Sequence, residues 1–186
     1  DKALAEFMPA GGQSYLSLYT QGWDIVRSNR YQRMLSGGII NPLYILSPLS
    51  DTPYNGSPAY QPVPAWTTLG ADRKADLARR MALYTSMIQQ LDYNVGRVVS
   101  RLSAGGQLDN TLIFIMSDNG CNAEGGMFGW ARTGTDVNKS NNHAALTGTD
   151  LAEMGQPFRN DNLSIGGGWA NVGNTPFRMY KRYSHE

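Results

Sequence analysis

The sequence is poor in cysteine and histidine, the side chains that form disulfides and most often bind zinc. Its 186 residues include one cysteine and two histidines. A single cysteine cannot form an internal disulfide, and neither histidine stands at a spacing typical of a zinc site. The sequence therefore excludes a disulfide framework and gives no sign of structural zinc.

Charge of one sign and long apolar runs are also scarce. The 16 basic and 15 acidic residues give a net charge of +1, without any block of like charges that would indicate a nucleic-acid partner. The longest apolar run, Leu112 to Met116, is far shorter than the ~20 residues that cross a bilayer. We expect no nucleic-acid partner and no membrane span.

The two ends of the sequence predict an incomplete domain. The first residues, DKALAEFMPAGG, lack an initiator methionine, and Glu6 and Pro9 interrupt the apolar stretch that a signal peptide needs. The last residues, MYKRYSHE, do not have the composition of a tail. We expect residues 1–186 to be one incomplete domain inside a longer protein.

A regular apolar stripe predicts one long helix over residues 71–104, ended by Gly105-Gly106. Steps of four and three residues place the stripe on one helix face. We interpret it as a core face packed against a sheet, the alternative being a coiled-coil seam. The stripe consists of Leu77, Met81, Tyr84, Ile88, Leu91, Val95, Val98 and Leu102.

Weaker patterns predict the remaining elements. Residues 15–35 indicate a helix interrupted near Gly22, and residues 41–50 a short strand. The prolines of residues 51–66 indicate a loop. We interpret IGGGW, residues 165–169, as a flexible bend that lets its tryptophan approach a binding site.

The segment TLIFIMS, residues 111–117, indicates a strand buried on both faces, because its apolar residues do not alternate with polar ones. Helix, short LDN turn and buried strand form half of an α/β unit. Beyond residue 119 glycine is dense and periodicity disappears, as in loops that line binding sites. We predict an α/β fold with a mostly parallel sheet flanked by helices, and long irregular loops.

Asp118 and Asn119 directly follow this predicted strand, where ligands collect in open α/β sheets. A carboxylate and an amide carbonyl are hard oxygen donors, which suit Ca²⁺ or Mg²⁺. The local sequence leaves a second interpretation open. SDNG can also be an ordinary turn whose side chains accept backbone hydrogen bonds, with Gly120 in the left-handed conformation.

Three blocks in order resemble the C-terminal half of the catalytic domain of the sulfatases, members of the alkaline-phosphatase-like superfamily. They are YTSMIQQLDYNVGRVVSRL, LDNTLIFIMSDNG and NTPFRMYKRYSHE, and YQPVPAW is similar to the bacterial arylsulfatase branch. The resemblance covers roughly residues 58–130 and 169–186. It implies a partial alkaline-phosphatase-like fold and a segment of a sulfuric-ester hydrolase.

The resemblance implies that Asp118 and Asn119 bind one divalent cation, Ca²⁺ or alternatively Mg²⁺. It also implies that Lys181 contacts the sulfate oxygens of a small-molecule or carbohydrate sulfate ester. These charges would stabilise the charge that builds during S–O cleavage. From sequence alone, Lys181 can equally be a solvated lysine in a basic run. The resemblance is compatible with a periplasmic or secreted enzyme, and the sequence does not indicate the oligomeric state.

Sulfatases use a formylglycine nucleophile, made from cysteine or serine in a Cys/Ser-x-Pro/Ala-x-Arg motif. Cys121 begins CNAEG, with Gly125 in place of the arginine, and we interpret it as a small loop residue. No other cysteine or serine fits the motif. We therefore expect the formylglycine and the remaining metal ligands upstream of Asp1, and no activity from this chain alone. We interpret His143 and His185 as surface histidines.

Two other functions stay open at this point. Phosphodiesterases and phosphonate hydrolases of the same superfamily share metal-binding strand ends, and the upstream nucleophile would distinguish them. The chain can also be a non-catalytic fragment without any activity of its own.

Overall fold

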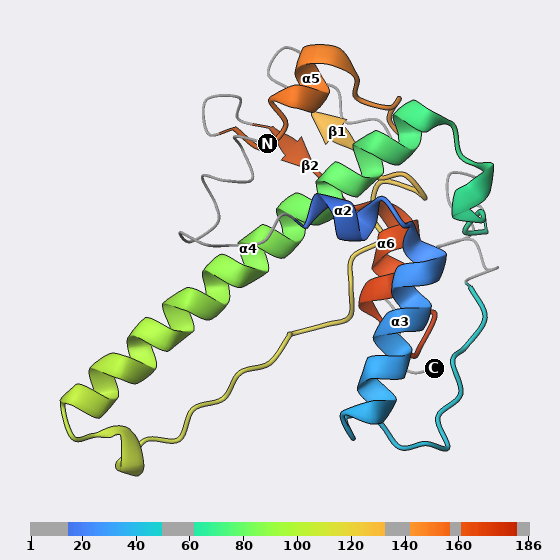
Figure 1. Ribbon diagram of the computed structural model, residues 1–186. Helices are drawn as coiled ribbons and strands as arrows, with labels where there is room; N and C mark the ends of the chain where they lie inside the picture. The colour runs from blue at the N-terminus through green and yellow to red at the C-terminus, as the bar shows by residue number, and fades with distance from the viewer. Residues whose placement is uncertain (1–14, 50–61, 133–141, 157–160, 182–186) are drawn as a thin grey trace.

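The computed structural model describes residues 15–49, 62–132, 142–156 and 161–181 (Figure 1). Within these residues, short helices and loops surround the first part of one long helix. None of the described helices is both long and apolar enough to span a membrane. The elements are α2 (Leu16–Tyr19), α3 (Trp23–Ser36), η2 (Trp66–Thr68), α4 (Ala71–Ala104), η3 (Leu108–Asn110), β1 (Ala131–Arg132), α5 (Gly148–Ala152), β2 (Asn162–Leu163) and α6 (Gly166–Gly173).

The predicted long helix is confirmed as α4, with the predicted bounds. The helix stops at Gly105 and Gly106, and Gly106 takes a φ of +65° that other residues rarely adopt. The apolar stripe is covered only at its N-terminal end, where Leu77 and Met81 are buried. In its C-terminal half Ile88, Leu91 and Val98 are exposed, so the interpretation of the whole stripe as a face against a sheet is not confirmed within the described residues.

The predicted helix break at Gly22 is also confirmed, because α2 and α3 meet at this residue. Gly22 has a φ of +87°, and a Cβ there would lie 2.2 Å from the Trp66 ring. The strand predicted for residues 41–50 is wrong over its described part, residues 41–49, which is irregular. Of the loop predicted for residues 51–66, residues 51–61 lie outside the described residues, residues 62–65 are irregular and Trp66 begins η2.

Four aromatic side chains from separate segments form the centre of the core. Tyr19, Trp23, Trp66 and Trp169 are all buried. Trp169 packs on the other three rings and Trp23 on Trp66, with ring centroids 4.9 to 5.7 Å apart and mostly edge to face. The two most buried indoles satisfy their N–H groups by donating to carbonyl oxygens: Trp23 Nε1 to Pro64 at 2.9 Å, Trp169 Nε1 to Leu77 at 2.9 Å. This cluster joins α2, α3, η2 and α6 around the start of α4.

The IGGGW segment is helical, which corrects its interpretation as a flexible bend. Residues 166–173 form α6, and Trp169 is fully buried in the core instead of approaching a binding site. A Cβ on Gly168 would lie 2.6 Å from the Trp23 ring, and one on Gly167 would lie 2.7 Å from the Met127 side chain. The glycines therefore allow close packing of α6 instead of flexibility.

A buried ion pair connects α4 to the loops around β1 and β2. Asp76 and Arg80 side chains are 0% and 1% exposed, and Arg80 Nε donates to Asp76 Oδ1 at 2.8 Å. Arg80 Nη1 also donates to the carbonyl oxygens of Trp130 at 2.6 Å and Ser164 at 3.1 Å. These bonds hold the chain that follows residue 120 against the first half of α4.

The segment 111–117 is extended but does not pair as a strand with any described segment, so its predicted burial in a parallel sheet is not confirmed. Leu112, Phe114 and Ile115 are 79%, 74% and 73% exposed. The sheet found among the described residues is the antiparallel pair β1 and β2, with Ala131 opposite Leu163. A strand buried on both faces needs neighbours on both edges and both faces, and the described residues supply none.

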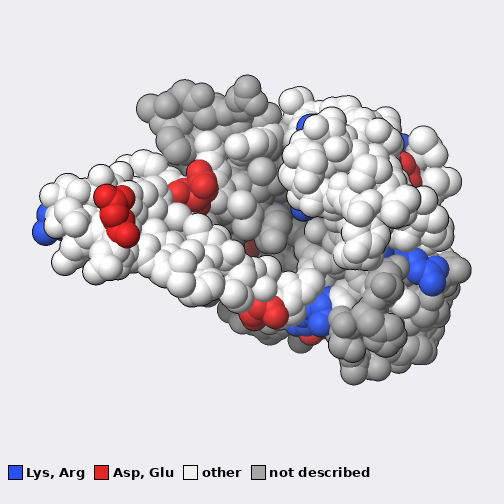
Figure 2. Space-filling view, turned by 90° about the horizontal axis from the view of Figure 1, so that it is seen from below, with Lys and Arg blue, Asp and Glu red and all other residues white. Residues whose placement is uncertain are grey.

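We call residues 87–117 the arm. It consists of the second half of α4, η3 and the extended segment that runs back toward the body (Figure 1). It projects from the body and carries few charged side chains on the face seen in Figure 2. Its exposed large apolar residues are Met87, Ile88, Leu91, Tyr93, Val98, Leu112, Ile113, Phe114, Ile115 and Met116.

Candidate functional site

Asp118 and Asn119 lie where the extended segment rejoins the body, and both are exposed. Within the part of the chain that the structure describes, the Asp118 carboxylate makes no hydrogen bond or ion pair. Asn119 uses its amide nitrogen, which donates to the Gly120 carbonyl at 2.9 Å, and Ser117 Oγ donates to the Asn119 carbonyl at 2.8 Å. The side-chain oxygens of both residues are therefore accessible to a ligand.

These oxygens fit a hard divalent cation as a partial set of ligands. Ca²⁺ takes six to eight oxygens, and Asp118 and Asn119 can supply two side-chain groups. No group of three or more histidine, cysteine or acidic residues suited to a metal occurs among the described residues. Asp118 and Asn119 alone would therefore supply only part of a cation's ligands.

Lys181 stands 60 positions after Cys121 in the sequence (181 − 121), but in the structure it packs against the loop that follows Asn119. Its backbone N–H donates to the Cys121 carbonyl at 3.1 Å. A Cβ on Gly120 would lie 3.5 Å from the Cα of Lys181. The backbone of Lys181 therefore packs directly against the two residues that follow Asp118 and Asn119.

The Lys181 ammonium pairs with Glu124, a residue that the sequence analysis did not single out. The distance from Lys181 Nζ to Glu124 Oε1 is 2.8 Å, and the two side chains are 29% and 39% exposed. The Glu124 N–H donates to Asn122 Oδ1 at 2.7 Å, and the Glu124 carbonyl accepts from Ser164 Oγ at 2.9 Å. A half-exposed ion pair adds little stability, but it limits the positions of the ammonium.

Asn174 is a second residue that the sequence analysis missed. Its Oδ1 accepts the Cys121 N–H at 2.7 Å, and its Nδ2 donates to the Met179 carbonyl at 2.6 Å. One side chain thus contacts both the loop that follows Asn119 and the segment that carries Lys181. Only its place inside the NTPFR block could have drawn attention to it.

Cys121 lies in this loop as a half-buried side chain. A Cβ on Gly173 would lie 2.6 Å from its Sγ, which shows how closely the sulfur packs on α6. Burial is the main cause that raises the pKa of the Cys121 thiol, partly offset by a backbone hydrogen bond at Asn122. A raised pKa disfavours the thiolate, the reactive form.

We expect Cys121 to react slowly with iodoacetamide in the folded chain. At pH 8 its alkylation should be severalfold slower than in the urea-unfolded chain, because both the raised pKa and the burial reduce attack by the thiolate. The folded-chain rate should keep rising to higher pH than the unfolded-chain rate does. Mass spectrometry of timed aliquots measures both rates, and equal rates at all pH values would contradict this expectation.

Of the two histidines, His143 lies away from the candidate site. His143 Nδ1 lies 2.8 Å from the Ala144 carbonyl oxygen, and the His143 carbonyl accepts from Arg73 Nη2 at 2.7 Å. This places it beside the first turn of α4. His185 lies outside the described residues.

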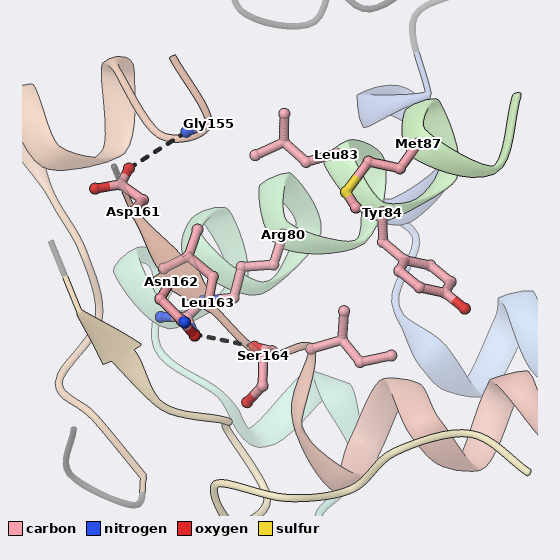
Figure 3. A pocket seen from close by; sticks show the side chains of 10 residues that line it. Arg80, Leu83, Tyr84, Met87, Gly155, Asp161, Asn162, Leu163 and Ser164 are labelled. Carbon is pink, nitrogen blue, oxygen red and sulfur yellow. Dashed lines mark hydrogen bonds between the residues drawn. The ribbon is translucent and has the colours of Figure 1, made fainter. Parts of the chain in front are cut away.

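A pocket of about 450 Å³ lies between α4 and β2 (Figure 3). Its walls are largely apolar, and the guanidinium of Arg80, one of the lining residues, is already bonded to Asp76 and to the Ser164 carbonyl. None of the candidate ligands predicted from the sequence lines this pocket. Its labelled apolar residues are Leu83, Tyr84, Met87 and Leu163.

Comparisons with known proteins agree on one family. The sequence profile of the Sulfatase family matches residues 27–169, a range that includes Asp118 and Asn119 and ends before Lys181. An uncharacterized sulfatase of Schizosaccharomyces pombe is 30% identical over 172 residues, covering 92% of this chain and 28% of that protein. An arylsulfatase of Klebsiella aerogenes is 27% identical over 164 residues, covering 88% of this chain and 31% of that protein. The chain therefore spans about a third of the length of these relatives.

Proposed function

This chain belongs to the sulfatase family, and on that premise we propose that it supplies one side of the active site of an arylsulfatase-type sulfuric-ester hydrolase. Family membership implies an alkaline-phosphatase-like α/β fold. The observation that carries the proposal is the packing of Lys181 against Gly120 and Cys121, directly after two oxygen-donor side chains. The backbone of a lysine from a distant part of the sequence thus packs against the two residues that directly follow the proposed cation ligands.

We assign separate roles to these residues. Asp118 and Asn119 would hold a divalent cation, for which Ca²⁺ is the best match to their oxygen donors. When bound, such a cation neutralises the charge on sulfate oxygens. Lys181 would contact the same sulfate group and stabilise the charge that develops as the S–O bond breaks. Glu124 holds the ammonium through the 2.8 Å ion pair, so binding of an ester would exchange or share this contact.

The exposed arm supports the further proposal that the catalytic domain is incomplete in these residues. Contiguous apolar surface larger than a few hundred Å² is rare on soluble monomers and marks a surface that packs against something else. The arm exposes ten large apolar side chains, and the extended segment within it has no strand partner among the described residues. We propose that the rest of a longer catalytic domain covers the arm and carries the formylglycine nucleophile.

A binding and turnover experiment tests this proposal. Titration calorimetry with CaCl₂ should detect binding to the longer protein that contains the chain, and Asp118→Ala should abolish it. Asp109→Ala is the matched control, because Asp109 is an exposed carboxylate at the far end of the arm. The chain should not hydrolyse 4-nitrophenyl sulfate, whereas the longer protein that contains it should.

Each outcome bears on a separate part of the proposal. Calcium binding that survives Asp118→Ala would contradict the ligand assignment, and turnover by the chain alone would contradict its incompleteness. If the longer protein hydrolyses bis(4-nitrophenyl) phosphate but no sulfate ester, the phosphodiesterase alternative replaces the sulfatase reaction.

A further inference from the structure

We propose that Asn174 is a positioning residue, which holds the Lys181 segment against the loop that begins at Asp118; the catalytic consequence rests on the role proposed above for Lys181. The observation is that one side-chain amide bridges the two segments. Asn174 Oδ1 accepts from the Cys121 N–H at 2.7 Å, and Asn174 Nδ2 donates to the Met179 carbonyl at 2.6 Å.

The bridge needs a donor and an acceptor on one short side chain. An asparagine amide offers both, whereas aspartate offers acceptors only and alanine offers neither. The Cys121 end of the bridge lies three residues after Asp118, and the Met179 end lies two residues before Lys181. The Lys181 N–H then donates to the Cys121 carbonyl at 3.1 Å and closes the connection.

The bridge is anchored to the core. Asn174 directly follows α6, and its backbone N–H donates to the Ala170 carbonyl at 3.1 Å. Trp169 and Ala170 in this helix are fully buried. The aromatic core therefore limits the motion of Asn174, and through Asn174 it fixes the position of the candidate site.

Gly120 shows how closely the bridged segments approach each other. A Cβ at this position would lie 3.0 Å from Asn174 Oδ1 and 3.4 Å from the Lys181 backbone nitrogen. The first of these distances is shorter than an ordinary van der Waals contact, and the second is at its lower limit. The methyl group added by Gly120→Ala should therefore push both Asn174 and the Lys181 backbone away from residue 120.

The first experiment measures the bridge without measuring activity. Hydrogen exchange, resolved by NMR for the amides of Cys121 and Lys181, is compared between the wild-type chain and variants. Asn174→Ala should accelerate exchange at both amides. Asn174→Asp keeps an acceptor for Cys121 but removes the donor to Met179, so it should accelerate exchange at Lys181 and leave Cys121 protected.

Thr175→Val is the matched control. Thr175 is buried one position further on, and its Oγ1 donates to the Val172 carbonyl at 2.7 Å without contacting the loop after Asp118. It should destabilise the same turn and leave both amides protected. If Asn174→Ala does not change exchange at Lys181, or if Thr175→Val changes it equally, the positioning role is wrong.

The second experiment tests whether Asn174 acts through Lys181. In the longer protein, Asn174→Ala should lower turnover of 4-nitrophenyl sulfate about 10- to 100-fold, the loss typical of a displacement of about 1 Å. In a Lys181→Ala background it should have almost no further effect, because residues that act as a unit are not additive. Full additivity would overturn the proposal. Absence of turnover in the wild-type protein would instead contradict the proposed function. The exchange experiment would still show whether Asn174 holds the two segments together.

If Asn174→Ala does not fold, Gly120→Ala provides a second test of the positioning role. Gly120→Ala leaves Asn174 and its core contacts in place, and should accelerate exchange at Lys181 through the short contacts described above. Wild-type protection at Lys181 in Gly120→Ala would contradict the close packing on which the inference depends.

Discussion

Lys181→Ala is expected to lower sulfate-ester turnover by the longer protein about 100- to 1000-fold, with little change in cation affinity. This is the loss seen when one group that stabilises transition-state charge is removed. The ammonium is held beside the loop after Asp118 by its backbone and by Glu124, so the substitution removes a positive charge from that place. Turnover of 4-nitrophenyl sulfate and calcium titration measure the two quantities.

Two variants sharpen this experiment. Lys181→Arg keeps the charge but changes its shape and reach, and should retain more activity than alanine. Lys74→Ala is the matched control, because Lys74 lies in the first turn of α4 and donates to the Thr67 carbonyl instead of lying at the site. Lys181→Ala activity equal to that of Lys74→Ala would remove Lys181 from the proposed mechanism.

Asp76→Ala is expected to destabilise the fold by about 3–5 kcal/mol, the usual cost when one partner of a buried ion pair is removed. Arg80, with a side chain 1% exposed, would keep its charge without the carboxylate that compensates it. Because Arg80 also bonds the carbonyls of Trp130 and Ser164, the loops around β1 and β2 should loosen with it. Urea unfolding followed by tryptophan fluorescence measures the loss.

A control and a rescue variant accompany the Asp76 experiment. Asp72→Ala, at an exposed position in the first turn of the same helix, should change stability by less than about 0.5 kcal/mol. The double variant Asp76→Ala with Arg80→Met should recover part of the loss, because no uncompensated charge stays buried. A loss below about 1 kcal/mol for Asp76→Ala would show that solvent reaches Arg80 and that the pair is not truly buried.

The elements that the sequence predicts correctly are those determined by local chemistry. The period of the apolar stripe and the pair Gly105-Gly106 determine both ends of α4 without reference to any other segment. Gly22 breaks the preceding helix because its φ of +87° is rarely open to another residue. Such features depend on neighbours within a few positions, which a single sequence displays directly.

The errors concern burial, which depends on distant partners. An apolar run such as residues 111–117 shows what a strand needs, but it does not show whether neighbouring strands are present. The glycines at 166–168 look like a flexible bend from sequence, whereas the structure uses them for contact with Trp23 and Met127. In both cases the deciding atoms belong to segments far away in the sequence.

The residues of the candidate site also fall into two groups, those that the sequence identifies and those that only the structure shows. Asp118, Asn119 and Lys181 were identified through a resemblance between whole blocks, and the structure packs the backbone of Lys181 against the two residues that follow Asn119. Their functional roles stay predictions. Glu124 and Asn174 have no local pattern, because each acts by contacting a segment about 50 or more positions away, and only coordinates show this.

The aromatic cluster has a consequence for the order in which the protein is made. Trp169 enters the ribosomal exit tunnel 103 residues after Trp66 (169 − 66), yet it packs against Trp23 and Trp66. Contacts so distant in sequence slow folding, since a long stretch of chain must be closed first. At synthesis rates of roughly 5–20 residues per second, the earlier indoles wait several seconds for their partner. During this interval Trp23 and Trp66 can pack on each other, but they lack the third indole that completes the cluster.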